Sequence, residues 1–149
     1  MLLRYLNPGI VVSELLVERR LRLPTGRETA LVEGLRFCYD LSETDVLILF
    51  ELLKGGEYTV DDLAQKLNLS KATINRGLAK LTELGFVTRT REKRSKVGRP
   101  RYKYFISDPE KIIQRIIRDF EDCAQAFRKT LLELAEEIKK QREEIVKRH

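Results

Sequence analysis

The last 40 residues of this chain contain no helix breaker, and this constrains the fold more than any other feature. Asp108-Pro109 supplies an N-cap followed by proline at the first helical position, and no glycine or proline occurs after Pro109. The pattern predicts one helix of about 40 residues, roughly 60 Å long at 1.5 Å per residue. The second half of such a helix is too long for a domain of this size to cover.

Apolar residues along this segment recur in alternating steps of four and three. Nine of the ten seam positions between Ile113 and Ile145 are apolar, and Gln141 is the exception. Such a seam is typical of a coiled coil. The alternative is packing against the chain's own domain, which the first half can satisfy; for the second half we expect a partner helix. The predicted dimerisation residues are Ile117, Phe120, Ala124, Phe127, Leu131, Leu134, Ile138 and Ile145.

Three shorter helices are predicted before this segment. The first begins at Ser42, which has the spacing of a capping box with Asp45. The second begins at Thr59, and the third runs from Ser70 to Gly85. Their predicted buried residues are Val46, Leu49, Phe50 and Leu53, then Leu63, Ala64 and Leu67, and finally Ile74, Leu78 and Leu81.

The second and third of these helices have the features of a helix-turn-helix. A short helix, a three-residue turn at Asn68-Leu69-Ser70 and a further helix follow in that order. Asn68 stands where the turn needs left-handed backbone, which Asn tolerates better than most residues. Ala64 is small where we expect the two helices to approach closely.

A basic β-hairpin is predicted after the third helix. Phe86–Thr90 and Arg101–Ile106 are rich in aromatic and β-branched residues, and a long tip ends in Gly98-Arg99-Pro100. Residues 89–103 contain eight Lys or Arg and one acid, Glu92, whereas the net charge of the whole chain is +6. The concentrated charge indicates a polyanionic partner. In isolation such a run could equally be a solvated basic loop.

Placed after a helix-turn-helix, the basic hairpin indicates double-stranded DNA as the partner. The exposed face of the third helix is predicted to carry cations and no acid; Asn75 can pair with an adenine edge and Arg76 with guanine or a phosphate. Arg99, held between glycine and proline, suits a narrow minor groove. The predicted DNA-binding residues are Ser70, Lys71, Thr73, Asn75, Arg76, Lys80, Arg89, Arg91, Lys93, Arg94, Lys96, Arg99 and Arg101.

The segments LSKATINRGLAKLTELGFVTRT and KVGRPRYKYFIS resemble archaeal winged-helix transcription regulators of the TrmB-like and leucine-responsive-regulator-like groups. MarR and ArsR proteins are more distant relatives, and the resemblance covers about Leu41 to Phe127. It implies a homodimer with the recognition helix in the major groove, the wing beside it, and the C-terminal helix pairing two protomers. The matching positions are Ser70, Lys71, Thr73, Asn75 and Arg76 in the recognition helix and Arg99 and Arg101 in the wing. The sugar-binding domain of full-length TrmB proteins is not expected, so small-molecule sensing is not carried over.

Other function classes find little support in the composition. Cys38 and Cys123 lie far apart without a CxxC motif, and His149 is the only histidine, so neither a zinc site nor another cofactor is predicted. No carboxylate pair, nucleophile–base set or glycine-rich phosphate loop indicates an enzyme. No apolar stretch approaches the ~20 residues of a membrane span, and Met1 does not begin a signal peptide, so we expect a cytoplasmic protein.

The predicted fold is mainly α with a small β-hairpin. Residues 1–40 form an N-terminal extension, either a helical pair or a hairpin and a possible dimer element, residues 41–107 a winged helix-turn-helix domain, and residues 108–149 the coiled-coil dimerisation helix. The predicted function is sequence-specific DNA binding by a homodimeric transcription regulator, with recognition helix 70–84 and wing 87–106. The alternative is a winged-helix protein–protein interaction module of the basal transcription machinery, a class whose third helix and wing are usually less basic. Neither the target genes nor the sign of regulation can be inferred from the sequence.

Overall fold

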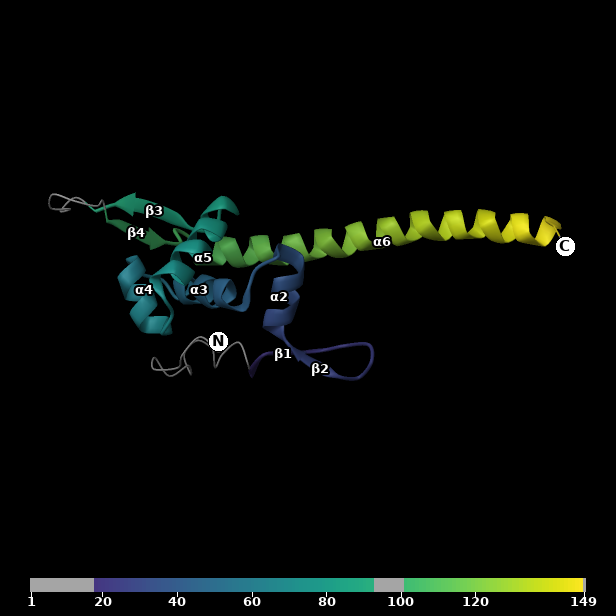
Figure 1. The fold of residues 1–149 in the computed structure, drawn as a ribbon. Coiled ribbons are helices and arrows are strands. Elements are labelled where there is room, and N and C mark those ends of the chain that lie inside the picture. Colours follow the sequence, from purple (N-terminus) through teal and green to yellow (C-terminus); the bar gives the residue numbers. More distant parts are fainter. Residues whose placement is uncertain (1–17, 93–100, 149) are drawn as a thin grey trace. The chain divides into compact units, whose positions relative to one another are not determined.

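The computed structural model describes residues 18–92 and 101–148 of the chain (Figure 1). Its elements follow one another in the order β1-β2-α2-α3-α4-α5-β3-β4-α6. The structure is mainly helical, with two-stranded hairpins and a long C-terminal helix, as the sequence predicts. The chain divides into two compact units, one ending at Ile112 and the other beginning at Ile113. The predicted domain boundaries after residues 40 and 107 stay predictions.

The N-terminal part of the described chain is a hairpin followed by a helix. β1 (Arg20–Arg22) pairs antiparallel with β2 (Glu28–Ala30), and α2 (Leu31–Tyr39) follows directly. Gly26 in the connecting turn has a φ of 86°, a conformation that favours glycine. Of the two predicted possibilities for this region, the described part is therefore a hairpin. Residues 1–17 lie outside the described residues.

Capping boxes fix the starts of the next two helices. α3 (Glu43–Leu53) begins after Ser42, whose Oγ accepts from the Asp45 amide at 3.1 Å. Asp45 Oδ2 in turn accepts from the Ser42 amide at 2.9 Å, so two amide donors at the helix end are satisfied. α4 (Val60–Leu67) begins with the same reciprocal pattern at Thr59. Both predicted helix starts are confirmed.

The turn between α4 and α5 (Lys71–Glu83) is also confirmed. Asn68 has φ 55° and ψ 48°, the left-handed conformation predicted for it, and its amide donates to the Ala64 carbonyl. Ser70 then caps α5 by accepting from the Thr73 amide at 3.1 Å. A left-handed residue followed by a capped helix makes the compact turn of a helix-turn-helix.

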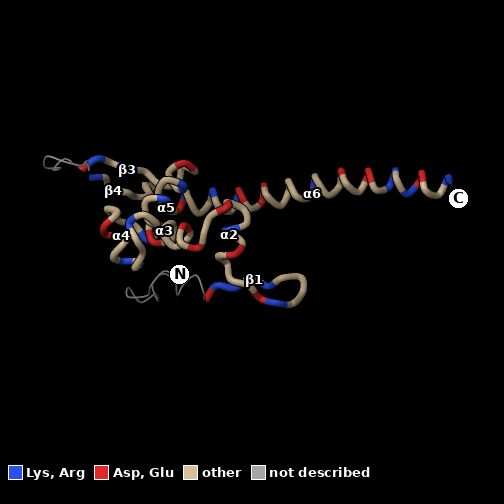
Figure 2. The backbone as a smooth tube through the Cα atoms, in the orientation of Figure 1, with Lys and Arg blue, Asp and Glu red and all other residues tan. Residues whose placement is uncertain are grey.

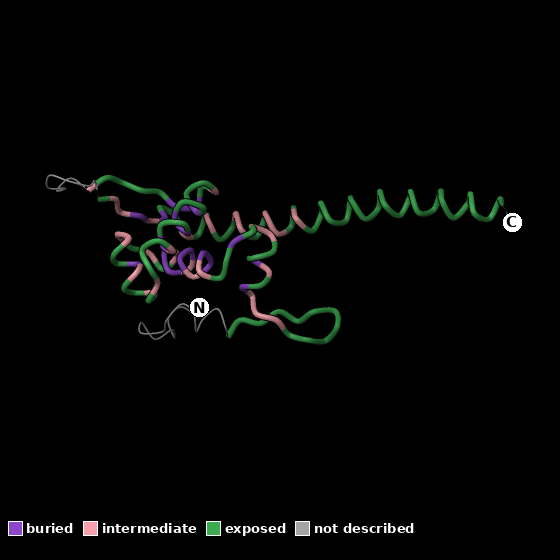
Figure 3. Tube along the Cα trace, in the orientation of Figure 1, coloured by how far each residue is buried: buried purple, intermediate pink, exposed green. Residues whose placement is uncertain are grey.

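α3 is packed against α2, α4 and α5 and is buried on more than one face. Ile48 and Leu52 are fully buried although they lie outside the predicted stripe, whereas Phe50 and Leu53 within it are only half-buried. The predicted stripe is therefore wrong in part, because a helix with neighbours on several sides has no single apolar face. Figure 3 shows the buried segments gathered in α3 and α5. The fully buried side chains are Val46, Ile48, Leu49, Glu51, Leu52, Leu63, Ile74, Leu78 and Leu81.

Gly77 allows α5 to approach α3 closely. A Cβ atom at this position would lie 2.5 Å from Ile48 Cδ1 and 3.0 Å from Asp45 Oδ1. Neither atom leaves room for a methyl group, so only glycine fits without rearrangement. The expected close approach of α4 and α5 at Ala64 stays a prediction, and the contact of Gly77 with α3 was not identified from the sequence.

Glu51 is a buried acid that links α3 to α4. Its Oε1 lies 2.8 Å from Lys66 Nζ and 3.4 Å from Lys54 Nζ. Lys66 Nζ also lies over the Tyr58 ring, 5.2 Å from the ring centroid. The hydrogen bond to Glu51 is the main reason why the pKa of Lys66 is raised above its ordinary value. This ion pair therefore helps to hold the helix-turn-helix against α3.

The wing is an antiparallel hairpin of β3 (Thr88–Arg91) and β4 (Tyr102–Phe105), with strands shorter than predicted. Tyr58 adds a bridge to the free edge of β4. Its amide donates to the Tyr104 carbonyl at 3.0 Å, and the Tyr104 amide donates back at 2.7 Å. The Tyr104 side chain is buried. The segment before α4 thus anchors the hairpin to the helix-turn-helix.

α6 (Pro109–Arg148) is one continuous helix of 40 residues, as predicted. Asp108 Oδ1 accepts from the Lys111 amide at 3.2 Å and caps it. Every residue from Ala124 to Arg148 is exposed (Figure 3). Within residues 18–92 and 101–148, no helix is both long and apolar enough to cross a membrane.

Candidate nucleic-acid interface

One face of α5 is polar and exposed, and the other is buried. Lys71, Asn75 and Arg76 are exposed, and Thr73 is half-buried. On the opposite face, Ile74, Leu78 and Leu81 are fully buried, and α5 packs there against α3 and α4. Packing therefore fixes the direction in which α5 presents its polar side chains. The division agrees with the sequence prediction, while the DNA-binding roles stay predictions.

The N-terminus of α5 has hydroxyl groups and no acid in its first turn. Ser70 Oγ lies 2.8 Å from Thr73 Oγ1, and Arg76 Nη2 donates to the same Thr73 oxygen at 3.3 Å. The free amides of a helix N-terminus carry partial positive charge and favour anions such as phosphate. Arg76 is thereby oriented on the exposed face beside a helix end that suits an anion such as phosphate.

Lys71 has an acidic partner that sequence reasoning missed. Its Nζ lies 2.9 Å from Oδ1 of Asp61 on α4, and both side chains are exposed. The hydrogen bond and the charge of Lys71 hold the pKa of the Asp61 carboxyl below its ordinary value. The exposed face of α5 contains no acid from Ser70 to Lys80, as expected, although Glu83 is exposed at the far end of the helix. The surroundings of that face differ from the prediction, because α4 contributes the Asp61 carboxylate.

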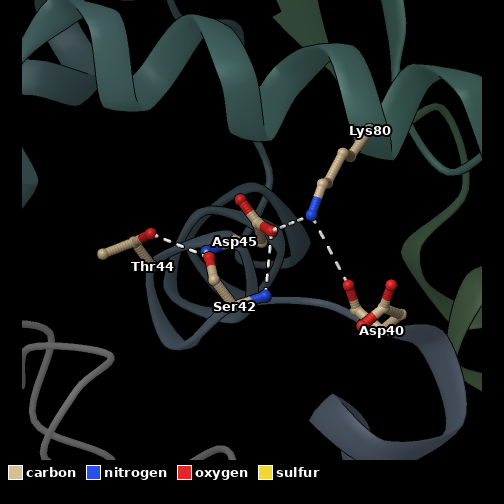
Figure 4. Close-up of polar contacts among 5 residues, drawn as sticks. All are labelled: Asp40, Ser42, Thr44, Asp45 and Lys80. Atoms are coloured by element: carbon tan, nitrogen blue, oxygen red, sulfur yellow. Dashed lines mark hydrogen bonds and ion pairs between the residues drawn. The ribbon is translucent and has the colours of Figure 1, made fainter.

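Lys80 points its ammonium toward the start of α3. Lys80 Nζ lies 3.5 Å from Asp45 Oδ2 and 3.5 Å from the Asp40 carbonyl oxygen (Figure 4). Asp45 is the same carboxylate that closes the capping box with Ser42. In this arrangement Lys80 ties α5 to the N-terminus of α3, and its predicted DNA-binding role stays a prediction.

The described part of the wing carries exposed arginines on β3 and directly before β4. Lys and Arg positions are blue in Figure 2. Arg89 and Arg91 on β3 pair with Tyr104 and Tyr102 in the strand register, and Arg101 directly precedes β4. The guanidinium of Arg89 lies over the Tyr102 ring, 4.4 Å from the ring centroid, a cation–π contact that orients it. The other predicted wing residues, Lys93, Arg94, Lys96 and Arg99, lie outside the described residues.

A cleft of about 590 Å³ lies between the helix-turn-helix and the wing. Its lining brings together two predicted DNA-binding residues of α5, Lys71 and Asn75, and one of the wing, Arg101. Asp61 lines the same cleft, as do Thr59, Val60, Tyr102 and Tyr104. The tertiary structure thus places side chains from three segments of the sequence around one cleft.

The predicted dimerisation residues form an apolar row on α6. Phe127, Leu131 and Leu134 are each more than half exposed, and Ile138 and Ile145 are exposed as well. Ile117 and Ala124 are exposed too, while Phe120 is half-buried. Charged residues of both signs alternate along the rest of the helix (Figure 2). An apolar row of this length on an otherwise charged helix is typical of an interaction surface.

No metal-binding cluster of three or more His, Cys, Asp or Glu residues occurs within the described part of the chain. Cys38 and Cys123 are both half-buried, one on α2 and the other on α6.

A family model described as "Sugar-specific transcriptional regulator TrmB" matches residues 35–110. An uncharacterized protein of Methanocaldococcus jannaschii is 31% identical over 103 residues, covering 67% of this chain and 82% of that protein. Among solved structures, a protein of Sulfolobus tokodaii has a TM-score of 0.55 and 33% identity, covering 65% of this chain and 90% of the other. A possible transcriptional regulator from Methanosarcina mazei Go1 has a TM-score of 0.65 and 20% identity, covering 76% and 95%, and shows similarity of fold.

Proposed function

The chain belongs to the TrmB family of transcriptional regulators, and from this premise we propose that it binds double-stranded DNA sequence-specifically as a homodimer. α5 enters the major groove, and the wing contacts the adjacent backbone or minor groove. α6 pairs two copies of the chain. The family match covers residues 35–110, which include the winged helix. This match concerns the proposed DNA-binding part of the chain, so we propose no small-molecule effector.

The observation that carries this proposal is the exposed face of α5 on a rigid support. Asn75 and Arg76 are exposed one after the other, and fully buried residues on the opposite face hold the helix in place. Asn pairs with adenine through two hydrogen bonds and Arg with guanine, so these are side chains that discriminate between bases. Because a packed helix does not have to be ordered on binding, these contacts lose little entropy.

The wing supports the proposal by adding cations beside α5. Arg101 lines the same cleft as Lys71 and Asn75, and Arg89 and Arg91 are exposed on the neighbouring strand. Contacts with phosphates fix the register of a protein on the duplex, while base contacts select the sequence. The two groups of residues therefore have complementary roles in one interface.

The apolar row on α6 supports the dimer. Its residues repeat at coiled-coil spacing over the length of the helix, and the row is exposed from Phe127 onward. Removing apolar surface from water stabilises an association by roughly 25 cal/mol per Å². A second α6 presents a matching row, so pairing buries both.

Titration with duplex DNA at increasing salt concentration tests the proposed partner. With about six phosphate contacts, a plot of log K against log salt has a slope near −5. A slope near zero would contradict DNA binding and favour a winged helix that binds protein.

The Arg76→Ala variant tests the proposed base contact. We expect a loss of roughly 1–3 kcal/mol in affinity for a selected site, with relaxed preference at one base position. Arg118→Ala removes an equally charged, exposed side chain from α6, outside the apolar row, and serves as the matched control. Equal losses in both variants, with unchanged base preference, would contradict the role of Arg76.

A further inference from the structure

Lys71 is already engaged by a carboxylate in the structure without DNA. Lys71 Nζ lies 2.9 Å from Asp61 Oδ1, although the two side chains are 70% and 56% exposed. Two exposed side chains that meet at this distance place a negative charge where the proposed function requires a DNA phosphate.

The same carboxylate also acts on the wing. Asp61 and Arg101 line one cleft with Lys71, and the charge of Arg101 contributes, after that of Lys71, to lowering the pKa of Asp61. Asp61 is therefore ionised at neutral pH and interacts with two cations, one on α5 and one beside β4.

Helix capping does not account for this carboxylate. The capping box of α4 is closed by the neighbouring Asp62, whose Oδ2 accepts from the Thr59 amide at 2.9 Å. Asp61 makes its ion pair across the turn with α5 instead. Asp61 lies in the first turn of α4, where a carboxylate favours the helix dipole, and its ion pair with Lys71 is a further interaction that joins α4 to α5.

We propose that Asp61 competes with the phosphates of duplex DNA for Lys71 and Arg101, and so weakens binding to DNA of any sequence. This inference rests on the proposed DNA-binding function and names the phosphodiester group as the ligand of the cleft. Binding requires the phosphate to displace Asp61 from Lys71, which is feasible because exposed ion pairs are weak. Base contacts by Asn75 and Arg76 are not opposed in this way, so the competition raises the share of affinity that depends on sequence.

The test compares full-length wild type with Asp61→Asn, using a mixed-sequence duplex of about 30 base pairs, long enough to cover two half-sites. Asp61→Asn removes the competing charge and retains the size of the side chain. We expect roughly two- to tenfold tighter binding at ~0.1 M salt, and a salt slope steeper by up to about one, because Lys71 then neutralises a phosphate outright. Glu83→Gln removes one exposed acid at the far end of α5 and is the matched control, with an expected change below about twofold.

A double-mutant cycle separates local competition from a general change in charge. In a Lys71→Gln background, Asp61→Asn should produce a smaller gain than in the wild type, because the main cation that it releases is absent. An equal gain in both backgrounds, or a gain no larger than that of Glu83→Gln, would overturn the proposal. If the wild type itself shows no salt-dependent binding to any duplex, the proposed DNA-binding function fails. If the wild type binds and Asp61→Asn does not bind more tightly, only the competition by Asp61 fails.

Discussion

The winged helix and α6 differ in whether one chain is enough to bury their apolar residues. In the winged helix, α3, α4 and α5 enclose fully buried Ile48, Leu63 and Ile74, and their N-termini are closed by side-chain caps. In the second half of α6 every residue is exposed, although its apolar positions repeat as regularly as those of any core helix. The first region buries its apolar residues within one chain, whereas one chain leaves the apolar row of the second region exposed, and the proposed function covers that row with a second copy.

This difference separates two kinds of stability. A buried core contributes the same free energy of unfolding at every protein concentration. An association between two chains contributes more as the concentration rises. Variants in the two regions should therefore respond differently to dilution, which gives each prediction a clear readout.

The largest effect is expected from Leu131→Asp combined with Leu134→Asp. Two charges in the apolar row of α6 oppose its burial, so the dimer should dissociate. The mass measured by light scattering should fall from twice the chain mass of 17.4 kDa in the wild type to the mass of a single chain in the variant. Leu132→Asp is the matched control, because Leu132 is equally exposed but lies off the row, and it should leave the mass unchanged. If the double variant has the same mass in solution as the wild type, α6 does not form the dimer contact.

The same substitution can be compared in both regions with Ile74→Ala and Ile138→Ala. Ile74 is fully buried, so its truncation should lower the free energy of unfolding by roughly 2–5 kcal/mol at any protein concentration. Ile138→Ala should lower stability only where the dimer is populated. Chemical denaturation at two widely separated protein concentrations distinguishes the two variants. If Ile138→Ala lowers the free energy of unfolding equally at both concentrations, α6 is not stabilised by association.

Gly77→Ala tests how tightly α5 fits against α3. The added methyl group meets Ile48 Cδ1, so we expect a loss of roughly 1–3 kcal/mol in the free energy of unfolding. Ile48→Val removes that Cδ1 atom, and in this background the cost of Gly77→Ala should be smaller. The same cost in both backgrounds would show that Ile48 is not the obstacle.

The smallest effect concerns the ion pair between Lys66 and Glu51. Because the pKa of Lys66 is raised above 10.5 in the folded protein, the pair stabilises the fold below that pH. Its contribution is lost as the pH rises through the folded-state pKa. Lys66 is 45% exposed, so we expect less than about 1 kcal/mol. Lys66→Met should lose less stability than the wild type between pH 9 and about pH 11; identical pH profiles would contradict this assignment.

Local signals in the sequence predicted the elements well. Ser42, Asn68 and Ser70 each predict a helix end or turn through contacts within a few residues, and the structure confirms all three. The uninterrupted segment after Pro109 likewise predicts the length of α6. These features depend on neighbouring residues alone, so they can be recognised without knowledge of the tertiary fold.

Contacts between distant segments were not predictable in the same way. The pairing of Tyr58 with β4 and the fit of Gly77 against α3 depend on how elements are arranged in space. The same holds for the site, where Asp61 meets Lys71 and Lys80 turns toward α3. The sequence therefore predicted which side chains of α5 are exposed, but not which of them already have partners.

The central claim is that a symmetric pair of winged helices binds a specific duplex. Its most direct test is selection of bound fragments from a random duplex pool, followed by footprinting of the enriched sequence. We expect a pseudo-palindromic site with half-sites about one turn, ~34 Å, or a multiple of it apart. Absence of any enriched sequence, or a single half-site protected without a symmetry mate, would contradict it.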